Sequence, residues 1–369
     1  MRVLLVNDRR PGAGSGVEVH LGLLADALDA AGDAVELFAG EIAHRGVAKV
    51  RDVWDPRARR ALAARAARFR PDVVHHHNVV RELSASVLGV PPDAACVLSI
   101  HDVRLLTGAE GVPPPVAALP VTLAKRAKGV LDRRVARANV DVVIAHSQAA
   151  ADGARRLGLP VHELAPFSAG PAEGDLAPPS AGAEILFAGR LSPEKGAGVL
   201  LDAFARASAT RPQARLVIAG DGPERAGLQL RAASVAGIEF TGVLDRDALQ
   251  ARLAKARAVV VPSLGAEGGP LAVVEAALAG RPTIVSDVPG VAELVSRYGN
   301  GIVVAPGDVD ALAAAVGSLL DDPEAADRMG AAGRAASVTR NSSAAVVPHV
   351  HAAYEDAIRR RRGRDSGGS

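Results

Sequence analysis

Short runs of apolar residues alternate with longer stretches of helical periodicity through most of the chain. In the first half, the apolar runs predict strands at Val3–Val6, Ala34–Ala39, Val73–His75, Val97–Ile100 and Val142–Ala145. Helical periodicity predicts helices between them, at Val17–Ala30, Arg57–Phe69 and Thr122–Ala138. Strands that are apolar throughout and separated by helices are typical of a parallel sheet covered on both faces. The pattern therefore predicts an α/β, doubly wound fold.

The same alternation restarts after a segment of different composition. Residues 167–182 are rich in Pro, Gly and Ala and lack periodicity, as expected of a linker. Beyond it, strands are predicted at Ile185–Ala188, Leu216–Ala219, Ile238–Thr241, Val259–Val261 and Thr283–Ser286. Helices are predicted at Val199–Ala209, Arg225–Ala233, Asp247–Ala256, Leu271–Ala279 and Asp310–Leu320.

The length of the chain, 369 residues, also favours two hydrophobic cores over one. We expect a first Rossmann-like domain over residues 1–166 and a second over 183–342. A C-terminal helix over 343–361 should pack back towards the first domain, and residues 362–369 should form a disordered tail.

Composition and charge exclude several classes of protein. The formal net charge is +2, from 43 basic and 41 acidic residues, which leaves no electrostatic footprint for wrapping nucleic acid. The single cysteine, Cys96, excludes an internal disulfide and a Cys-rich zinc site. No apolar run has the length of a signal-peptide core or the roughly 20 residues that span a bilayer. We therefore expect a soluble, cytoplasmic protein.

Two glycines and a proline precede one of the predicted helices. Residues 267–280 read EGGPLAVVEAALAG, and no side chain at the helix start is suited to capping its first backbone N–H groups. Such a terminus suits an anion, above all a diphosphate. Glu275 lies about one turn inside the helix, where its carboxylate can accept hydrogen bonds from ribose hydroxyls. Glu267 lies just before the helix and can hold sugar hydroxyls.

A second segment carries two cations after a strand. Residues 189–196 read GRLSPEKG and follow the strand Ile185–Ala188. Arg190 offers a planar, bidentate fork and Lys195 a point charge, so the two can converge on one anion.

A glycine-rich turn follows the first strand. Residues 12–17 read GAGSGV, and such a turn lets the backbone approach a phosphate closely. The spacing is close to the dinucleotide-binding pattern G-x-G-x-x-G, but Val17 stands in the place of the third glycine. Glu36 lies near the acidic position of that pattern. A nicotinamide-dependent oxidoreductase therefore stays open as an alternative.

Histidines and paired aspartates raise the question of a metal site. His101 and Asp102 follow the strand Val97–Ile100, at the end where α/β folds bind ligands. The three histidines at 75–77 point to alternate faces of a strand and do not converge easily. The Asp-x-Asp sequences at 245–247 and 308–310 precede helices, where Asp acts as a cap. We expect no metal site.

These segments together resemble the large family of retaining glycosyltransferases with the GT-B fold, known as family 4. The resemblance spans nearly the whole chain and rests most on Glu267 and Glu275, with seven residues between them, and on the segment Arg281–Leu294 that follows. It implies a donor-binding second domain and an acceptor-binding first domain. It also implies that Glu275 binds the donor ribose, Glu267 lies against the donor sugar, and Arg190 and Lys195 bind the diphosphate.

The resemblance implies part of the remaining site, and the places of residues at strand ends suggest the rest. His101 contacts the donor sugar, and we add Asp102 beside it as a catalytic candidate. The other donor-binding candidates are Gly14, Ser15, Gly16, Gly189, Gly222, Val243, Gly268, Gly269, Pro270 and Leu271. The candidates on the acceptor side are His75, His77, Asn78 and Arg104.

The expected reaction is transfer of a hexose-type sugar from a nucleotide diphosphate donor, with a UDP-sugar favoured, to a hydroxyl acceptor. The acceptor is a glycan, a lipid-linked molecule or a small molecule, and no cofactor or metal is required. The basic stretch 121–138 is either a solvated helix face or a contact with an anionic membrane surface. Besides the oxidoreductase, an epimerase of the same fold and a non-catalytic sugar-nucleotide binding protein stay open.

Overall fold

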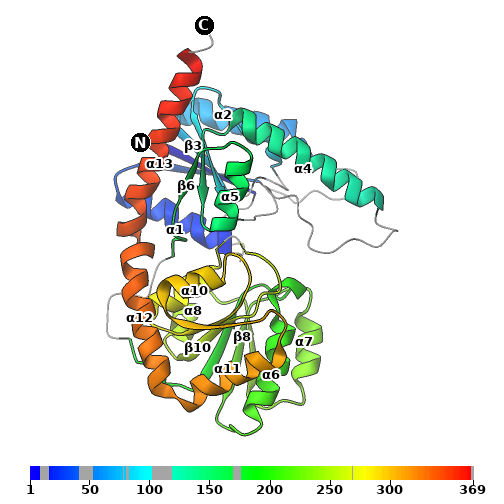
Figure 1. Ribbon diagram of the computed structural model, residues 1–369. Coiled ribbons are helices and arrows are strands. Elements are labelled where there is room, and N and C mark those ends of the chain that lie inside the picture. The colour runs from blue at the N-terminus through cyan, green and yellow to red at the C-terminus, as the bar shows by residue number, and fades with distance from the viewer. Residues whose placement is uncertain are drawn as a thin grey trace. The chain divides into compact units, whose positions relative to one another are not determined.

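The computed structural model describes residues 1–8, 16–40, 53–77, 79, 83–101, 119–168, 176–267 and 269–366. They form two compact units, each with its own parallel sheet (Figure 1). The first unit contains Met1–Ala165 and Val346–Ser369, and the second contains Pro166–Ala345. Two parallel six-stranded sheets with helices confirm the predicted α/β, doubly wound fold.

The sheet of the first unit has the strand order β2-β1-β3-β4-β5-β6. Its strands are β1 (Arg2–Asn7), β2 (Ala34–Ala39), β3 (Val73–His76), β4 (Ala95–Ile100), β5 (Val142–Ala145) and β6 (Val161–Glu163). Its described helices before residue 165 are α1 (Gly16–Ala30), α2 (Pro56–Phe69), the short 3-10 helix η2 (Ala85–Val87), α4 (Leu119–Asn139) and α5 (Gln148–Arg156). Strands β3, β4 and β5 are buried at every position, as expected of a parallel sheet that is covered on both faces.

The sheet of the second unit has the order β12-β11-β10-β7-β8-β9. Its strands are β7 (Glu184–Ala188), β8 (Arg215–Ala219), β9 (Ile238–Gly242), β10 (Ala256–Val261), β11 (Thr283–Ser286) and β12 (Gly301–Val304). Its helices are η4 (Pro179–Ala181), η5 (Pro193–Lys195), α6 (Ala197–Ser208), α7 (Arg225–Ala232), α8 (Arg246–Leu253), α9 (Leu271–Leu278), α10 (Ala292–Tyr298), α11 (Val309–Asp321) and α12 (Pro323–Asn341). The strand order reverses between β7 and β10, and α/β folds bind ligands at that reversal.

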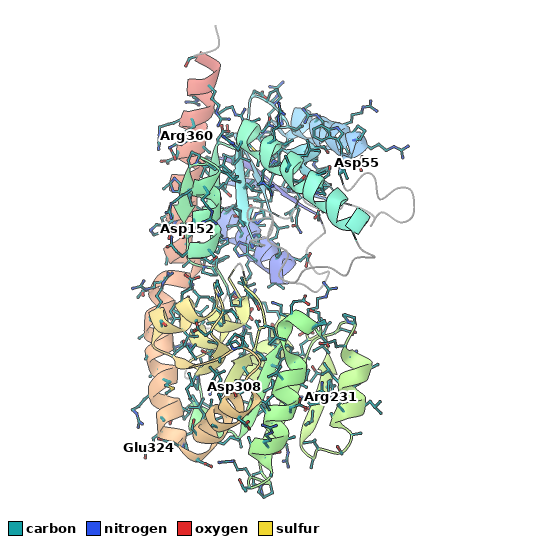
Figure 2. The ribbon with its side chains drawn as sticks, turned by 45° about the vertical axis from the view of Figure 1, so that its right-hand side comes forward. Asp55, Asp152, Arg231, Asp308, Glu324 and Arg360 are labelled. Carbon is teal, nitrogen blue, oxygen red and sulfur yellow. The ribbon has the colours of Figure 1, made fainter. Side chains whose placement is uncertain are left out.

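Aspartate caps begin several helices, two of which are visible in Figure 2. Asp55 accepts hydrogen bonds from the first turn of α2, and Asp308 from the N–H of Ala311 in α11. Asp245 caps α8 in the same way through the N–H of Ala248. The Asp-x-Asp sequences at 245–247 and 308–310 thus each supply a helix cap, as predicted.

The last helix, α13 (Ser343–Ser366), continues five residues beyond the expected end at residue 361. It belongs to the first unit from Val346 onward. His351 contacts Asp33 at 2.6 Å, and the hydroxyl of Tyr354 lies 2.8 Å from Nδ1 of His75. Near the other end, Arg361 forms an ion pair with the fully buried Asp141. Residues 362–366, which the sequence led us to expect in a disordered tail, belong to this helix, and Arg364 among them contacts Asp141 at 3.4 Å.

Within the described chain, two strands and three α-helices lie outside the predicted set: β6, β12, α5, α10 and α12. The longest of them, α12, packs through its glycines and not through a stripe of large apolar side chains. A Cβ at Gly330 would lie 2.1 Å from the carbonyl oxygen of Gly280, and one at Gly333 would lie 2.6 Å from the Cβ of Asn300. Close approach of backbones replaces large apolar side chains there, so the helical period is weak in the sequence. No helix in the described part of the chain is long and apolar enough to cross a membrane.

Candidate functional site

The loops after β7 and β10 meet on the second unit's sheet at the point where its strand order reverses. Gly196 has a φ of 68°, and a Cβ there would lie 1.9 Å from the carbonyl oxygen of Pro262. The N–H of Leu264 donates to the carbonyl of Glu194 at 2.8 Å. Only glycine permits this approach, so the β7 loop is fixed against the β10 loop.

Lys195 and Glu267 come together where these loops meet. Lys195 Nζ lies 2.7 Å from Glu267 Oε2, and the hydroxyl of Ser263 donates to Oε1 of the same carboxylate. The backbone N–H of Glu267 donates to the carbonyl of Pro289 at 2.9 Å, which ties the loop to the one after β11. A cation and a carboxylate are therefore held as a preformed pair. Arg190, on the β7 loop, is exposed.

Helix α9 begins at Leu271 with Pro270 in the capping position. Pro270 has φ −69° and ψ 115°, and it makes no side-chain capping hydrogen bond. Gly269 before it has a φ of 125°. Neither residue carries a polar side chain, so within the described chain the helix keeps the uncapped amide end that the sequence predicts. That end has the partial positive charge suited to an anion.

Glu275 is half-buried on α9 and accepts a hydrogen bond of 3.2 Å from the hydroxyl of Ser168. Burial raises the pKa of Glu275, against the opposing effects of the Ser168 hydrogen bond and the positive charge of Arg246. The carboxylate is thus poorly solvated and available to hydroxyl donors. Ser168 lies in the segment predicted as linker, where no sequence signal marked it as a site residue.

Gly222 and Val243 lie on loops that are joined to the β7 loop. A Cβ at Gly222 would lie 2.2 Å from the carbonyl oxygen of Leu191, and the N–H of Leu191 donates to the carbonyl of Asp221 at 2.9 Å. The N–H of Gly220 donates to the carbonyl of Gly242, directly before Val243, which is 58% exposed. Gly189 donates to the carbonyl of Ala219. The structure thus groups Gly189, Gly222 and Val243 at the carboxyl ends of β7, β8 and β9.

His101 occupies the corresponding edge of the first unit's sheet. It follows β4, and its Nε2 lies 3.0 Å from Nδ1 of His77, which follows the neighbouring strand β3. The rings of His20 and His146 also lie near His101, with centroids 5.1 and 5.3 Å away. Burial, with the neighbouring His20 and His146, holds the pKa of His101 well below its usual range. The ring is therefore neutral and not a charged anchor.

His75 makes two hydrogen bonds inside the unit. Its Nδ1 lies 2.8 Å from the hydroxyl of Tyr354, and its Nε2 lies 2.8 Å from the hydroxyl of Ser99. Both ring nitrogens are thus engaged in joining β3 to β4 and α13. The other candidates Gly14, Ser15, Asn78, Asp102, Arg104 and Gly268 lie outside the described residues, and Gly16 begins α1.

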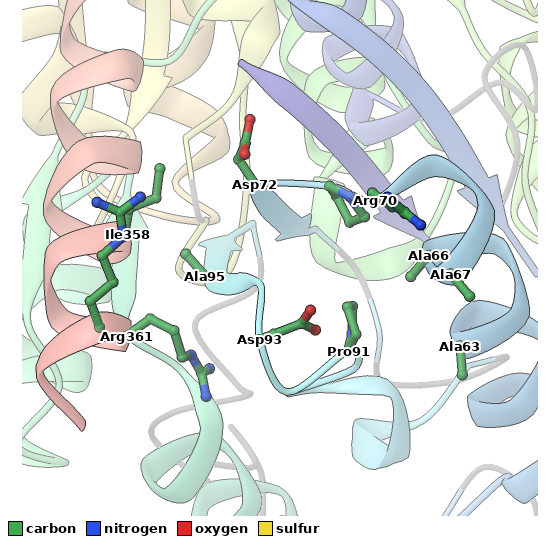
Figure 3. Close-up of a pocket in the computed structure, with 12 residues that line it drawn as sticks. Ala63, Ala66, Ala67, Arg70, Asp72, Pro91, Asp93, Ala95, Ile358 and Arg361 are labelled. Carbon is green, nitrogen blue, oxygen red and sulfur yellow. The ribbon is translucent and has the colours of Figure 1, made fainter. Parts of the chain in front are cut away.

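A pocket of about 530 Å³ lies at the opposite edge of the first unit's sheet (Figure 3). Asp72 and Ala95 line it where β3 and β4 begin, and Asp93 and Arg361 face it. Ligands of α/β folds bind beyond the carboxyl ends of the strands. The pocket is therefore distinct from the candidate site.

Comparisons with known proteins match both halves of the chain. A model of the family described as Glycosyl transferases group 1 matches residues 173–336, and one described as Glycosyltransferase Family 4 matches residues 14–165. Glycogen synthase from Mycobacterium tuberculosis is 43% identical over 155 residues, 41% of this chain and 37% of that protein. Alpha-D-kanosaminyltransferase from Streptomyces kanamyceticus is 34% identical over 149 residues, 39% of this chain and 38% of that protein. The aligned parts thus span under two fifths of these relatives.

Solved structures share the fold over 95–96% of the chain. Sucrose-phosphate synthase from Thermosynechococcus elongatus superposes with a TM-score of 0.75 and 21% identity, covering 96% of this chain and 98% of that one. HepE from Anabaena in complex with UDP and glucose superposes with a TM-score of 0.70 and 18% identity, covering 95% of this chain and 98% of that one.

Proposed function

The chain belongs to the group 1 glycosyltransferases, with the GT-B fold, and we propose its reaction from that membership. It transfers a hexose-type sugar from a nucleotide diphosphate donor to a hydroxyl acceptor, with retention of the anomeric configuration. The observation that carries the proposal is the Lys195–Glu267 pair on the loops next to the uncapped start of α9. A cation, a sugar-binding carboxylate and free amides are the groups that a nucleotide-sugar donor requires.

The leaving diphosphate gains negative charge as the glycosidic bond breaks. Lys195, Arg190 and the first amides of α9 stabilise that charge, in place of a metal ion. Glu267 orients the sugar hydroxyls, and Glu275 accepts hydrogen bonds from the ribose. The acceptor hydroxyl attacks the face that the diphosphate leaves, and a phosphate oxygen takes its proton. Activity should therefore survive treatment with a chelator.

A uridine donor is favoured by the structural neighbours. HepE from Anabaena has been solved with UDP, with UDP and glucose, and with UDP-glucose. The backbone near Gly222 and the exposed Val243 are the groups that we assign to the base. The base is then recognised mainly by backbone polar groups.

We also propose that α4 makes a peripheral contact with an anionic membrane surface. Of its basic residues, Lys128 is already paired with Asp132 at 2.5 Å. Sedimentation with vesicles of phosphatidylglycerol at low and high salt tests this contact. Salt-sensitive binding that requires the anionic lipid supports it, and the same partitioning with phosphatidylcholine vesicles contradicts it.

Thermal-shift screening tests the donor assignment. UDP, GDP, ADP, TDP and NADH are compared on the wild type, on Lys195→Met and on Lys255→Met, which removes an exposed lysine of the same unit. We expect a shift with a nucleoside diphosphate that is lost in Lys195→Met and kept in Lys255→Met. A shift with NADH alone would favour the oxidoreductase, although Glu36 is already paired with Arg65 at 2.5 Å.

Turnover then separates transfer from binding. The stabilising nucleotide is supplied as its sugar conjugate with a panel of hydroxyl acceptors, and the product is identified by mass. Glycosylated product with the donor's anomeric configuration supports the proposal. Free sugar or an isomerised nucleotide sugar without acceptor would favour an epimerase, and no conversion would favour a binding protein.

A further inference from the structure

Three histidines from different elements of the first unit converge on one point. His20 lies on α1, His101 follows β4 and His146 follows β5. Each offers one ring nitrogen, and the three nitrogens all lie within 4.8 Å of one another. The ring centroids are 5.1 to 5.3 Å apart, so the imidazoles surround a common centre.

One ring nitrogen of His146 is buried without a hydrogen-bond partner among the described residues. The Nδ1 of His146 lies 3.2 Å from the carbonyl oxygen of Leu164, which can only accept, so Nδ1 carries the proton. The Nε2 of His146 then carries a lone pair, and the described residues offer it no hydrogen bond. The side chain is 8% exposed. A buried lone pair of this kind requires a partner, and a metal ion supplies one.

We propose that His20, His101 and His146 form a binding site for one divalent first-row transition ion, with Zn²⁺ as the reference ion. Imidazole nitrogen favours zinc, copper, nickel and cobalt, whereas magnesium and calcium prefer oxygen ligands. Three imidazoles with a further position open is a common arrangement for zinc in proteins. At Zn–N distances of about 2.0–2.1 Å the nitrogens lie roughly 3.3 Å apart, so small side-chain rotations close the site.

The surroundings fit this assignment. His77 lies 3.0 Å from Nε2 of His101 and can hold that ring in place, as outer hydrogen-bond partners of metal-binding histidines do. His101 is also the residue that we assign to the donor sugar. An ion in this site occupies its imidazole, so the ion competes with that role and does not assist the transfer. The site itself does not depend on the proposed reaction.

Titration of the full chain with Zn²⁺ and Co²⁺ tests the site, with any polyhistidine tag removed. Calorimetry should show one equivalent of Zn²⁺ per chain, and Co²⁺ should give the intense visible bands of a four-coordinate complex. His20→Gln and His146→Gln should abolish this stoichiometric binding. His162→Gln, which alters a partly exposed histidine of the same unit, should retain it.

X-ray absorption of the wild-type Zn²⁺ complex covers the case in which a cluster variant does not fold. It should show imidazole nitrogen at about 2.0–2.1 Å. The proposal is overturned if the wild type binds no stoichiometric Zn²⁺, if oxygen alone surrounds the ion, or if folded cluster variants bind as the wild type does.

Discussion

Lys195 and Glu267 are 72 residues apart in the chain, yet they form an ion pair of 2.7 Å. They belong to the loops after β7 and β10, the two strands between which the sheet order reverses. The Glu267 side chain is 11% exposed and that of Lys195 is 33% exposed. The cation is thus held in place by the carboxylate that we assign to the sugar.

Replacing Lys195 by Met should lower turnover by about 100- to 1,000-fold, because one preorganised charge on the leaving diphosphate is lost. Steady-state kinetics with the donor identified by thermal shift measures this. Lys255→Met is the control, since it removes an exposed lysine from the same unit. Wild-type turnover in Lys195→Met would remove the diphosphate assignment.

Replacing Glu275 by Gln should stabilise the second unit while weakening nucleotide binding. Burial raises the pKa of Glu275, so the folded protein binds that proton more tightly than the unfolded chain does. The ionised group therefore destabilises the fold above its folded pKa. This cost disappears as pH falls through that pKa towards the ordinary glutamate value.

Urea unfolding at pH 7 and at mildly acidic pH, with UDP affinity at pH 7, measures both effects. The stability gain of Glu275→Gln over the wild type should be larger at pH 7 and shrink on acidification. A variant that is less stable at pH 7, with unchanged nucleotide affinity, would contradict both roles of the carboxylate.

The sequence signals for the second unit's candidate site are local. A strand, a turn and the beginning of a helix follow one another directly in the sequence. The uncapped amide end of α9 can therefore be predicted from Pro270 alone. The fold follows in the same way from unbroken apolar runs such as Val142–Ala145, which matches β5 residue for residue.

Contacts between segments that are far apart in the sequence are harder to predict. Ser168 reaches Glu275 from a segment without periodicity, and no pattern relates the two positions. Two members of the proposed cluster do have a sequence signal: His101 and His146, like their neighbour His77, each follow one of three adjacent parallel strands, whose carboxyl ends meet at one edge. Considering only the consecutive histidines at 75–77 hides that relation. Helix α12 is not predicted because it packs through glycine contacts and lacks an apolar stripe.

Replacing Pro270 by Asp should stabilise α9 and impair donor binding. Pro270 already has the extended backbone of a capping residue, so an Asp carboxylate there can accept from the first free amides. Such a cap contributes about 1 kcal/mol to stability. It also fills the proposed anion site with a negative charge.

Thermal unfolding without nucleotide and UDP affinity of Pro270→Asp are measured together. Pro270→Asn is the matched control, because it caps the helix without adding charge. We expect both variants to be more stable, and the Asp variant to bind UDP more weakly than the Asn variant. Unaltered UDP affinity in Pro270→Asp would place the diphosphate away from α9.

Replacing Arg361 by Met should destabilise the first unit strongly. Arg361 contacts Asp141 at 2.8 Å, with side-chain exposures of 12% and 0%, and Asp141 also accepts from the N–H of Cys96. Removing one partner of a buried pair costs about 3–5 kcal/mol when the other charge is left buried and uncompensated. Arg364 also contacts Asp141, at 3.4 Å, so the loss of Arg361 should cost less than this full amount. Arg360→Met is the matched control. Its pair with Asp356 is more exposed, so its loss should cost less than about 1 kcal/mol.

Chemical unfolding of the two single variants and of Arg361→Met combined with Asp141→Asn separates the pair from the packing. The double variant should be more stable than Arg361→Met, because the second change removes a buried charge that would otherwise keep only the longer, 3.4 Å ion pair with the more exposed Arg364. If Arg361→Met costs no more than Arg360→Met, Asp141 does not depend on the last helix. If the double variant is the least stable, the guanidinium acts through packing and its backbone contact to Asn139 rather than through the charge of Asp141.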